Sequence, residues 1–305
     1  MRVTVLGSGS AGNATLVEAA DARILIDAGF SGRDLERRLI AVDVDPATIS
    51  AIVITHDHGD HTRGMGVLAR RYRVPILMTP RTHRACDGLL DGSEDIRTYG
   101  STAPFTLGSL EVRPFLTVHD AVDPVAVTVC DVDTGARLGI ATDLGRPTAA
   151  VRAALKGCHM LILEANHDDA MLWNGPYPWS VKQRIASSHG HLSNRAAARL
   201  ASELYHGGLS NIVLAHLSEH CNHAELAHEA VARTLGRLRY RGRLAVAPQD
   251  RPMEPVTIKH VKIVRKDAGY LMTVKYEVRK PLIANLDVVG KFEAEKELRR
   301  GGAID

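Results

Sequence analysis

Short apolar runs alternate with amphipathic stretches along most of the 305-residue chain. Gly, Ser, Asn and Asp residues separate the apolar runs, as they do in the turns between strands. Runs of this length and composition predict buried or half-buried β-strands. We expect strands at Val3–Leu6, Thr15–Glu18, Arg23–Asp27, Ala51–Thr55, Leu110–Phe115, Val125–Cys130, Arg137–Ala141, Met160–Leu163, Ile212–Leu214 and Leu244–Val246.

Stretches with helical spacing of apolar residues lie between these strands. We expect helices at Ser31–Ile40, with Ser31 as its N-cap, and at His61–Tyr72, Pro147–Leu155, Tyr177–Ser187, Asn194–Tyr205 and Ala224–Leu238. Strand-rich halves with interleaved helices favour two packed sheets flanked by helices, a layered α/β architecture.

The chain changes character after Pro252. Two alternating runs, Val256–Val264 and Tyr270–Val278, are joined by Lys266-Asp267-Ala268-Gly269, which predicts a β-hairpin. The residues through Arg300-Gly301-Gly302 are expected to be frayed. We therefore predict a main domain over residues 1–258 and a C-terminal appendage over residues 259–305.

Composition restricts the class of protein. Apolar residues make up 45% of the chain and aromatic residues only 4%, so Val, Ile, Leu and Ala must build most of the core. No apolar run reaches 18 residues, which excludes a transmembrane helix. The chain opens on a strand pattern rather than a signal segment. Its four cysteines lack CxxC spacing, which indicates reduced thiols and a cytoplasmic location.

The net charge of +3 is unevenly distributed. Residues 259–305 carry 11 Lys and Arg against 7 Asp and Glu, which leaves about −1 for the preceding residues. A basic appendage is compatible with binding a polyanion, and equally with a solvated surface. It could also extend a groove, form a homodimer contact, or pair by its strand edge with another protein.

Candidate chemistry is concentrated in His56-Asp57-His58-Gly59-Asp60-His61, directly after the apolar run Ala51–Thr55. Three imidazoles and two carboxylates within six residues would repel one another unless cations lay among them. Imidazole suits zinc, iron and manganese, and carboxylates suit harder ions, so a mixed set can hold two metals side by side. The alternative is an exposed His-rich loop, which the preceding buried strand disfavours. We interpret this segment as a metal-binding loop.

Three further polar residues end apolar runs. They are His119, Asp143 and His216, each placed where a side chain leaves a strand for a cleft. A single histidine at such a position is more often structural. Three such residues beside the metal loop favour a shared metal site.

With these residues in place, the chain resembles the metallo-β-lactamase fold and, within it, the YycJ/WalJ family of bacterial nuclease-like hydrolases. The resemblance covers roughly residues 1–258, and the stretch from Glu164 to Asn194 points most specifically to this family. The matching segments are Leu6–Asn13, Ile26-Asp27-Ala28-Gly29, the metal loop, His119–Pro124, Thr142-Asp143-Leu144-Gly145, Glu164–Asp168, Gly175–Pro178, Gly190–Asn194 and His216-Leu217-Ser218.

The resemblance implies a four-layer αββα sandwich whose catalytic domain spans residues 1–258. It also implies that His56, His58 and His119 hold one divalent metal ion, zinc or manganese. Asp60, His61 and His216 would hold a second ion, with Asp143 bridging the two. Two cations about 3.5–4 Å apart can share a hydroxide, which would act as the nucleophile, and can clamp the attacked phosphoryl oxygens. Asp60, Asp143 and His191 are the catalytic candidates.

His191 lies where related phosphodiesterases such as ribonuclease Z have a histidine that assists phosphate hydrolysis. We expect it to act as a general acid or a phosphate contact, or else to orient a metal ligand. Other candidate substrate or supporting residues are Glu164, His167, Lys182, Arg184, Ser193 and Asn194. Ser193 and Asn194 could cap a helix or present its amides to phosphate, and capping is the expected role of Ser193. Lys182 and Arg184 could line a phosphate groove or be solvated. The Gly/Ser-rich loop Gly7–Asn13 lacks the lysine of a P-loop and is interpreted as a turn near the site.

The leading hypothesis is metal-dependent phosphodiester hydrolysis, with DNA degraded from a 5′ end; the polarity and the preference for DNA over RNA come from the resemblance. Processing of tRNA is disfavoured because no basic arm is inserted. His216 follows Asp143 by only 73 positions, which leaves no room for an inserted domain. Hydrolysis of a small cyclic phosphodiester, thioester or lactone is the alternative, since fold does not determine function. A non-catalytic partner is disfavoured by the complete ligand set.

Overall fold

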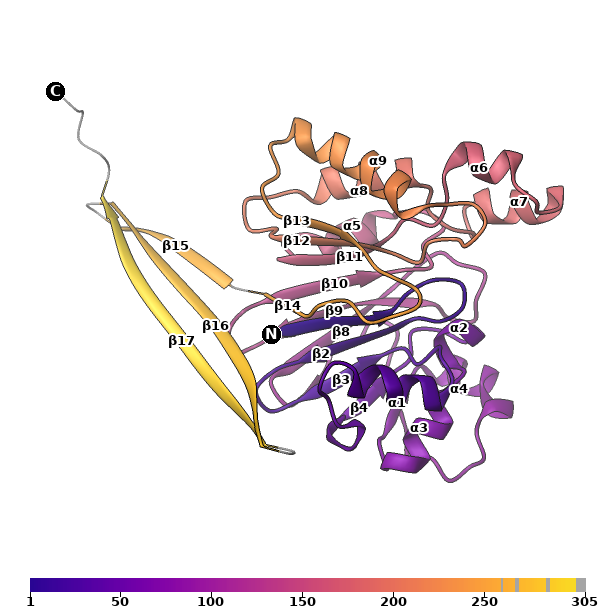
Figure 1. Cartoon of the computed structure of the whole chain (residues 1–305), viewed down its shortest axis with the longest axis horizontal. Helices are drawn as coiled ribbons and strands as arrows, with labels where there is room; N and C mark the ends of the chain where they lie inside the picture. The colour runs from indigo at the N-terminus through magenta and orange to yellow at the C-terminus, as the bar shows by residue number, and fades with distance from the viewer. Residues whose placement is uncertain (259, 267–268, 284–285, 300–305) are drawn as a thin grey trace.

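The computed structural model describes residues 1–258, 260–266, 269–283 and 286–299. Its main part is built from two seven-stranded sheets that pack face to face, with helices on the outer face of each sheet (Figure 1). The four-layer αββα architecture implied by the resemblance is therefore confirmed.

The first sheet has the strand order β14-β1-β2-β3-β4-β5-β6. Its pairs are antiparallel from β14 to β3 and parallel from β3 to β6. The carboxyl ends of β3 and β4 therefore meet at the same edge of the sheet. The strands are β1 (Arg2–Gly7), β2 (Ala14–Glu18), β3 (Arg23–Ile26), β4 (Ala51–Val53), β5 (Ile76–Met78), β6 (Ile96–Thr98) and β14 (Val256–Thr257).

The second sheet has the order β13-β12-β11-β10-β9-β8-β7, with parallel pairs from β13 to β10. The carboxyl ends of β10, β11 and β12 therefore lie next to one another. The strands are β7 (Phe105–Leu107), β8 (Leu110–Leu116), β9 (Val125–Asp131), β10 (Arg137–Ala141), β11 (Met160–Glu164), β12 (Asn211–Ala215) and β13 (Arg243–Val246).

Helices and 3₁₀ turns connect these strands. They are α1 (Gly32–Ile40), η1 (Pro46–Thr48), α2 (Gly59–Thr62), α3 (Met65–Tyr72), α4 (Pro80–Ala85), η2 (Asp87–Leu89), α5 (Ala149–Leu155), α6 (Asp169–Asn174), α7 (Trp179–Ala186), α8 (Asn194–Leu204) and α9 (Ala224–Arg237). Ser31 caps α1 as expected, accepting a hydrogen bond from the Asp34 amide. None of the helices in the described part of the chain is long and apolar enough to cross a membrane.

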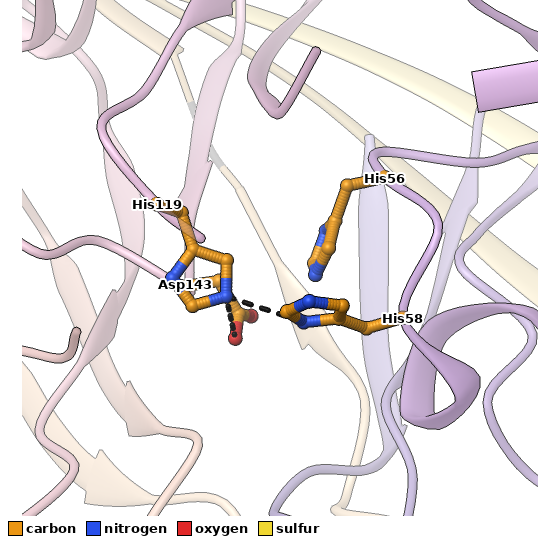
Figure 2. Close-up of side chains that lie close together, drawn as sticks. All are labelled: His56, His58, His119 and Asp143. Atoms are coloured by element: carbon orange, nitrogen blue, oxygen red, sulfur yellow. Dashed lines mark hydrogen bonds and ion pairs between the residues drawn. The ribbon is translucent and has the colours of Figure 1, made fainter. Parts of the chain in front are cut away.

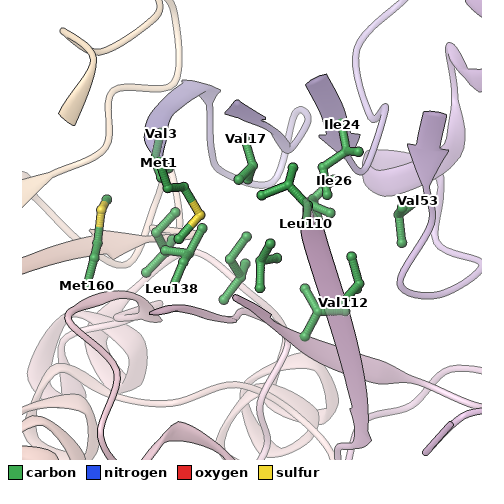
Figure 3. Packing of buried hydrophobic residues seen from close by; sticks show 14 of the residues in the cluster. Met1, Val3, Val17, Ile24, Ile26, Val53, Leu110, Val112, Leu138 and Met160 are labelled. Atoms are coloured by element: carbon green, nitrogen blue, oxygen red, sulfur yellow. The ribbon is translucent and has the colours of Figure 1, made fainter. Parts of the chain in front are cut away.

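Three apolar clusters hold the layers together, and strand alternation assigns side chains to them. On β2, Val17 faces the core between the two sheets, whereas its neighbour Leu16 packs under the helices of the first sheet. On β11, Ile162 faces the core between the sheets and Leu163 packs under α8 and α9. Figure 3 shows the middle cluster, where Val3 and Ile24 of the first sheet and Leu138 and Met160 of the second contribute side chains to the space between the sheets. Because both faces of these strands are buried, their sequences are continuous apolar runs rather than alternating apolar and polar residues.

One expected helix is divided in the structure. The range His61–Tyr72 contains the end of α2 and all of α3, separated at Gly64. The Gly64 amide donates to the carbonyl of Ala28 at 2.8 Å, and a Cβ on Gly64 would lie 2.2 Å from the carbonyl oxygen of Phe30. This close backbone approach breaks the helix and holds the metal loop against residues 27–30, so the single-helix prediction was wrong here.

The C-terminal residues divide between two sheets. Val256 and Thr257 add β14 to the edge of the first sheet, and residues from His260 onward form a separate three-stranded sheet of β15 (His260–Lys266), β16 (Gly269–Ile283) and β17 (Leu286–Arg299). The antiparallel pairing of β15 with β16 agrees with the expected hairpin. Its turn residues Asp267 and Ala268 lie outside the described residues, as does the end expected to be frayed. Strand β17 was not expected from the sequence.

Candidate metal centre

The loop after β4 carries four of the candidate ligands. His56 lies three residues after the end of β4, His58 is the N-cap residue of α2, and Asp60 and His61 lie within that helix. His56 and His61 are buried. The metal loop can pack closely against residue 29 because Gly29 has no side chain: a Cβ there would lie 1.6 Å from the carbonyl oxygen of Asp60. The Ala28 amide donates to the His61 carbonyl at 2.7 Å, which ties the loop to the end of β3.

The other three candidates come from the second sheet. His119 lies after β8, Asp143 after β10 and His216 after β12, and all three are buried. Asp143 and His216 have φ angles of 55° and 56°, in the left-handed region that non-glycine residues rarely adopt. Such conformations concentrate at functional sites, where the surrounding structure maintains them. The two sheets thus bring all seven expected ligands together.

A first group consists of His56, His58, His119 and Asp143 (Figure 2). The group offers one ligand atom per residue, and these atoms lie within 4.8 Å of one another. His119 Nε2 is 3.3 Å from His58 Nδ1 and 3.5 Å from Asp143 Oδ1. This spacing is suitable for one ion bound among them.

A second group consists of Asp60, His61, Asp143 and His216. His216 Nε2 lies 3.2 Å from Asp60 Oδ2, and His61 Nε2 lies 3.0 Å from Asp143 Oδ2. Asp143 belongs to both groups, with Oδ1 toward His119 and Oδ2 toward His61. Its position between the groups is the one that a bridging carboxylate would occupy.

Each of the five histidines has one ring nitrogen bonded away from the centre. Nδ1 of His61 donates to Asp27 at 2.8 Å, and Nδ1 of His216 donates to Glu164 at 3.0 Å. The remaining outward partners are the Thr55 hydroxyl for His56 at 3.0 Å, the Asp120 carbonyl for His58 at 3.3 Å and the Gly190 carbonyl for His119 at 3.2 Å. This arrangement orients the other nitrogen inward, as in histidines that bind metals.

The inward nitrogens fit a cation. Nδ1 of His58 and Nε2 of His119 face each other at 3.3 Å, although the second nitrogen of each ring already donates to a carbonyl. Nε2 of His56 is buried and has no hydrogen-bond partner in the described part of the chain. Burial lowers the pKa of His56 and of His119, so both rings are neutral and offer lone pairs. Lone pairs that converge in this way suit a divalent metal ion.

Charge in the second group is balanced differently. Burial opposes protonation of His61 and His216, but nearby carboxylates, with Asp143 foremost, outweigh it and hold both pKa values well above the usual range. Burial likewise opposes ionisation of Asp143, but the pKa of its carboxyl is held well below the ordinary value by His216 and His61. Without metal, therefore, protons on these histidines supply the positive charge that the carboxylates require.

Glu164, at the end of β11, links two histidines to the backbone. Oε1 accepts from Nδ1 of His191 at 2.7 Å and from Nδ1 of His216 at 3.0 Å. Oε2 accepts from the amides of Leu144 at 2.9 Å and Leu192 at 3.0 Å. Burial raises the pKa of Glu164, but His191 and the other donors outweigh it and lower the pKa to about 2. Glu164 is thus an ionised support beneath the site.

Three supporting residues were not assigned from the sequence. Asp27 accepts from His61, and it also accepts from the Thr55 amide at 2.9 Å. Asn13 donates to Asp60 Oδ2 at 3.2 Å, and Ser8 connects Asn13 to the His216 amide through bonds of 2.7 and 2.9 Å. The loop Gly7–Asn13 is therefore a turn beside the site. Asp27 has a φ of 62°, and this left-handed conformation cannot be predicted from the residue type alone.

A cavity of about 320 Å³ opens over the two groups. His191 and Arg184 line it together with Asp60, Asp143 and His216. Arg184 is exposed, and its Nε lies 4.0 Å from Asp120 Oδ2. Because Nδ1 of His191 is bonded to Glu164, its other ring nitrogen is free to face the cavity.

The remaining candidate substrate residues do not line this cavity. Lys182 Nζ donates to the Trp173 carbonyl at 2.9 Å, and His167 is buried. Ser193 caps α8 by accepting from the Ala196 amide at 3.3 Å, and Asn194 is buried against Asn222 with 2.9 Å bonds. A substrate role for these four residues stays a prediction, and their contacts in this structure are structural.

Comparison with known proteins agrees with the fold. The family model described as a beta-lactamase superfamily domain matches residues 22–217, and the model of a domain of unknown function matches residues 252–292. Among solved structures, YhfI of Bacillus subtilis, a metallo-beta-lactamase fold protein, superposes with a TM-score of 0.65 at 19% identity, covering 83% of this chain and 99% of that one. Zn²⁺-bound PqqB of Methylobacterium extorquens superposes with a TM-score of 0.63 at 15% identity, covering 83% and 100%.

The fold and the histidine-carboxylate cluster define an enzyme of the metallo-β-lactamase hydrolase superfamily. Curated relatives include exodeoxyribonuclease YycJ of Bacillus anthracis, 35% identical over 65% of this chain and 75% of the relative. Exodeoxyribonuclease WalJ of Streptococcus pneumoniae is 34% identical over 65% of this chain and 74% of the relative. Within the superfamily, the chain belongs to the YycJ/WalJ family.

Proposed function

We propose that this protein is a dinuclear metal-dependent phosphodiesterase that degrades DNA from a 5′ end. The observation that carries the proposal is the pair of histidine-carboxylate groups that share Asp143 at the floor of one cavity. The exodeoxyribonuclease names of the YycJ and WalJ relatives support DNA as the substrate. The four cysteines of this chain are free thiols, which supports a cytoplasmic location.

His56, His58 and His119 would hold one divalent ion, and Asp60, His61 and His216 the other, with Asp143 bridging. Zinc and manganese both suit this donor set. When bound, the ions would lower the pKa of water and polarise the phosphoryl oxygens of the substrate. Asp27, Glu164 and the loop Gly7–Asn13 keep the ligands oriented before substrate arrives.

His191 would act on the leaving oxygen. Burial lowers its pKa, but Glu164 outweighs this and raises the pKa above the ordinary value, which favours the protonated ring that a general acid requires. Nδ1 of His191 donates a hydrogen bond to Glu164. Its other ring nitrogen, Nε2, can then give its proton to the leaving oxygen as the phosphorus–oxygen bond breaks. Arg184 at the cavity rim would pair with a phosphate oxygen.

The test is hydrolysis of 5′-phosphorylated DNA, single- and double-stranded, by protein reconstituted with Mn²⁺ or Zn²⁺. We expect stepwise release of mononucleotides from the 5′ end, with no product from Asp143→Asn. Metal-loaded protein that leaves DNA intact but cleaves RNA would move the substrate to RNA. Cleavage of only a small ester or thioester would overturn the nuclease assignment.

A further inference from the structure

The two tryptophans of the chain lie side by side on the surface near the candidate metal centre. Trp173 is on α6 and Trp179 on α7, with 42% and 64% of their surface exposed. Their ring centroids are 5.3 Å apart. Large aromatic side chains are usually mostly buried, so two adjacent exposed indoles form an aromatic surface that is available to bind a flat apolar group.

Helix α7 connects this surface to the candidate site. Arg184 and Ile185, near the end of α7, line the site cavity, and Trp179 begins the same helix. Arg184 follows Trp179 by five positions, a rise of about 7.5 Å along the helix. Lys182 ties α7 to the end of α6 through the Trp173 carbonyl. The indoles are thus held a short distance from the place where a phosphate would bind.

We propose that Trp173 and Trp179 stack against unpaired bases of the DNA strand whose phosphate enters the site. This inference rests on the proposed function and adds that the bound end is single-stranded. Bases of a duplex are stacked on one another, whereas those of a single strand present free faces to aromatic side chains. Stacking of this kind accepts any base, which suits an exonuclease that must move along a sequence.

Intrinsic fluorescence gives a direct measurement because both tryptophans of the chain belong to this surface. Metal-loaded protein is titrated with a nuclease-resistant phosphorothioate oligothymidylate and with an abasic strand of equal length and charge. We expect the first to quench emission and the second to leave it nearly unchanged. Equal quenching by both strands would overturn base stacking.

Kinetics give a second measurement. Trp179→Ala should raise KM for a single-stranded 5′-phosphorylated oligonucleotide by about 5- to 100-fold, with kcat changed less. Trp179→Phe should retain most of the affinity, and Leu89→Ala, which removes an exposed apolar side chain on η2, should match wild type. A wild-type KM in Trp179→Ala would refute the stacking role. Wild-type protein that does not degrade DNA would instead refute the proposed function.

A different observation concerns charge. A groove of about 880 Å³ lies along α8 and α9, with Arg195 and Arg199 from α8 and Arg233 and Arg237 from α9 among its lining residues, and Arg152 of α5 beside them. Its lining includes alanines of both helices, and no Asp or Glu lines it among the described residues. Small residues between two rows of arginines leave an open channel with basic walls.

Two of these arginines have uncompensated charge. Arg152 pairs with Glu203 at 2.6 Å, Arg195 with Asp169 at 3.5 Å, and Arg233 with Glu229. Arg199 and Arg237 are exposed and form no ion pair with any residue that the structure describes. The groove therefore has a net positive charge on a domain that is otherwise close to neutral.

One lining residue of the groove is close along the chain to a lining residue of the site cavity. Ser193 lines the groove and His191 lines the site cavity, so the two are separated by at most about 7 Å of chain. We infer that the groove binds the phosphate backbone of the DNA beyond the reacting end, an inference that also rests on the proposed function. Guanidinium groups are well suited to phosphate, and their contacts would carry no sequence preference.

The salt dependence of binding tests this directly. The double variant Arg199→Gln/Arg237→Gln should lower the slope of log affinity against log salt by about 1.4 for single-stranded DNA, since each lost phosphate contact removes about 0.7. The control is Arg33→Gln/Arg73→Gln, which removes two exposed arginines from the helical layer of the other sheet; neither forms an ion pair with a described residue. Equal slopes for the two double variants would overturn the groove assignment. So would a wild-type protein that binds an acidic polypeptide but does not bind single-stranded DNA.

Discussion

The Glu164 carboxylate accepts a 2.7 Å hydrogen bond from Nδ1 of His191, and the same oxygen accepts from Nδ1 of His216. One buried carboxylate therefore fixes both a candidate metal ligand and the candidate proton donor. Two backbone amides occupy its second oxygen, so the carboxylate has no freedom to reorient. The metal centre and the acid are consequently expected to depend on the same residue.

Glu164→Gln should weaken both functions. An amide keeps one oxygen but places an NH₂ group against N–H donors, so two of the four bonds cannot form. We expect metal affinity and phosphodiester turnover each to fall by about 10- to 100-fold. Chelator competition and hydrolysis assays measure the two effects. Glu111→Gln, which breaks only a surface pair with Arg113, is the control and should match wild type. Unchanged metal affinity would show that Glu164 does not support the ligands.

His191→Ala should separate chemistry from metal binding. Loss of a general acid should reduce turnover by about 10²- to 10⁴-fold, whereas metal content should change little. His189→Ala removes an exposed histidine two residues away and serves as control. If His191→Ala instead loses metal, the residue acts by supporting His216 and Asp143.

Metal binding should release protons near neutral pH. The pKa values of His61 and His216 are raised in the metal-free protein, so both rings are protonated at pH 7, yet a metal ligand must be neutral. Affinity should therefore rise with pH. Calorimetry at pH 7 in two buffers of different ionisation enthalpy should show a release of at least about two protons per chain, one from each ring, and ionisation of water at the metals would add another. A binding heat independent of the buffer would contradict this charge assignment.

Removal of residues 259–305 should spare the chemistry. The two large sheets are complete by β14, and the Ile258 amide donates to the Met1 carbonyl at 2.9 Å at the edge of the first sheet. The truncated protein should hydrolyse bis(p-nitrophenyl) phosphate at the wild-type rate with a similar melting temperature. Loss of this activity would assign the appendage to the catalytic domain.

The sequence identified the ligand loop because His56–His61 are adjacent in the chain and follow a recognisable buried strand. His119, Asp143 and His216 were found because a polar residue that ends an apolar run marks a sheet edge. Asp27, Asn13 and Ser8 were missed because their roles depend on a left-handed backbone or on loops that meet only in the folded chain. The residue type of Asp27 does not distinguish a turn residue from a support for His61.

Element boundaries followed local signals where these were strong. Ser31 and Ser193 cap helices as expected, and the strand Arg137–Ala141 was predicted with its observed bounds. The strands β5, β6 and β7 were missed because three residues are too few to show the alternation of apolar and polar positions that marks a strand. Strand β17 was missed because its Lys and Glu residues weaken the alternation typical of strands. Gly64 interrupts a helical pattern for a tertiary reason, the proximity of Phe30, that no local pattern contains.

The most direct test of the dinuclear centre is the metal content of the purified protein. Wild-type chain and Asp143→Asn are incubated with excess Zn²⁺ or Mn²⁺, desalted, and measured by mass spectrometry of the metal against protein concentration. The geometry predicts two ions per wild-type chain and fewer in Asp143→Asn, with the same circular dichroism for both. One ion or none in folded wild-type protein would contradict the paired site on which the proposed function depends.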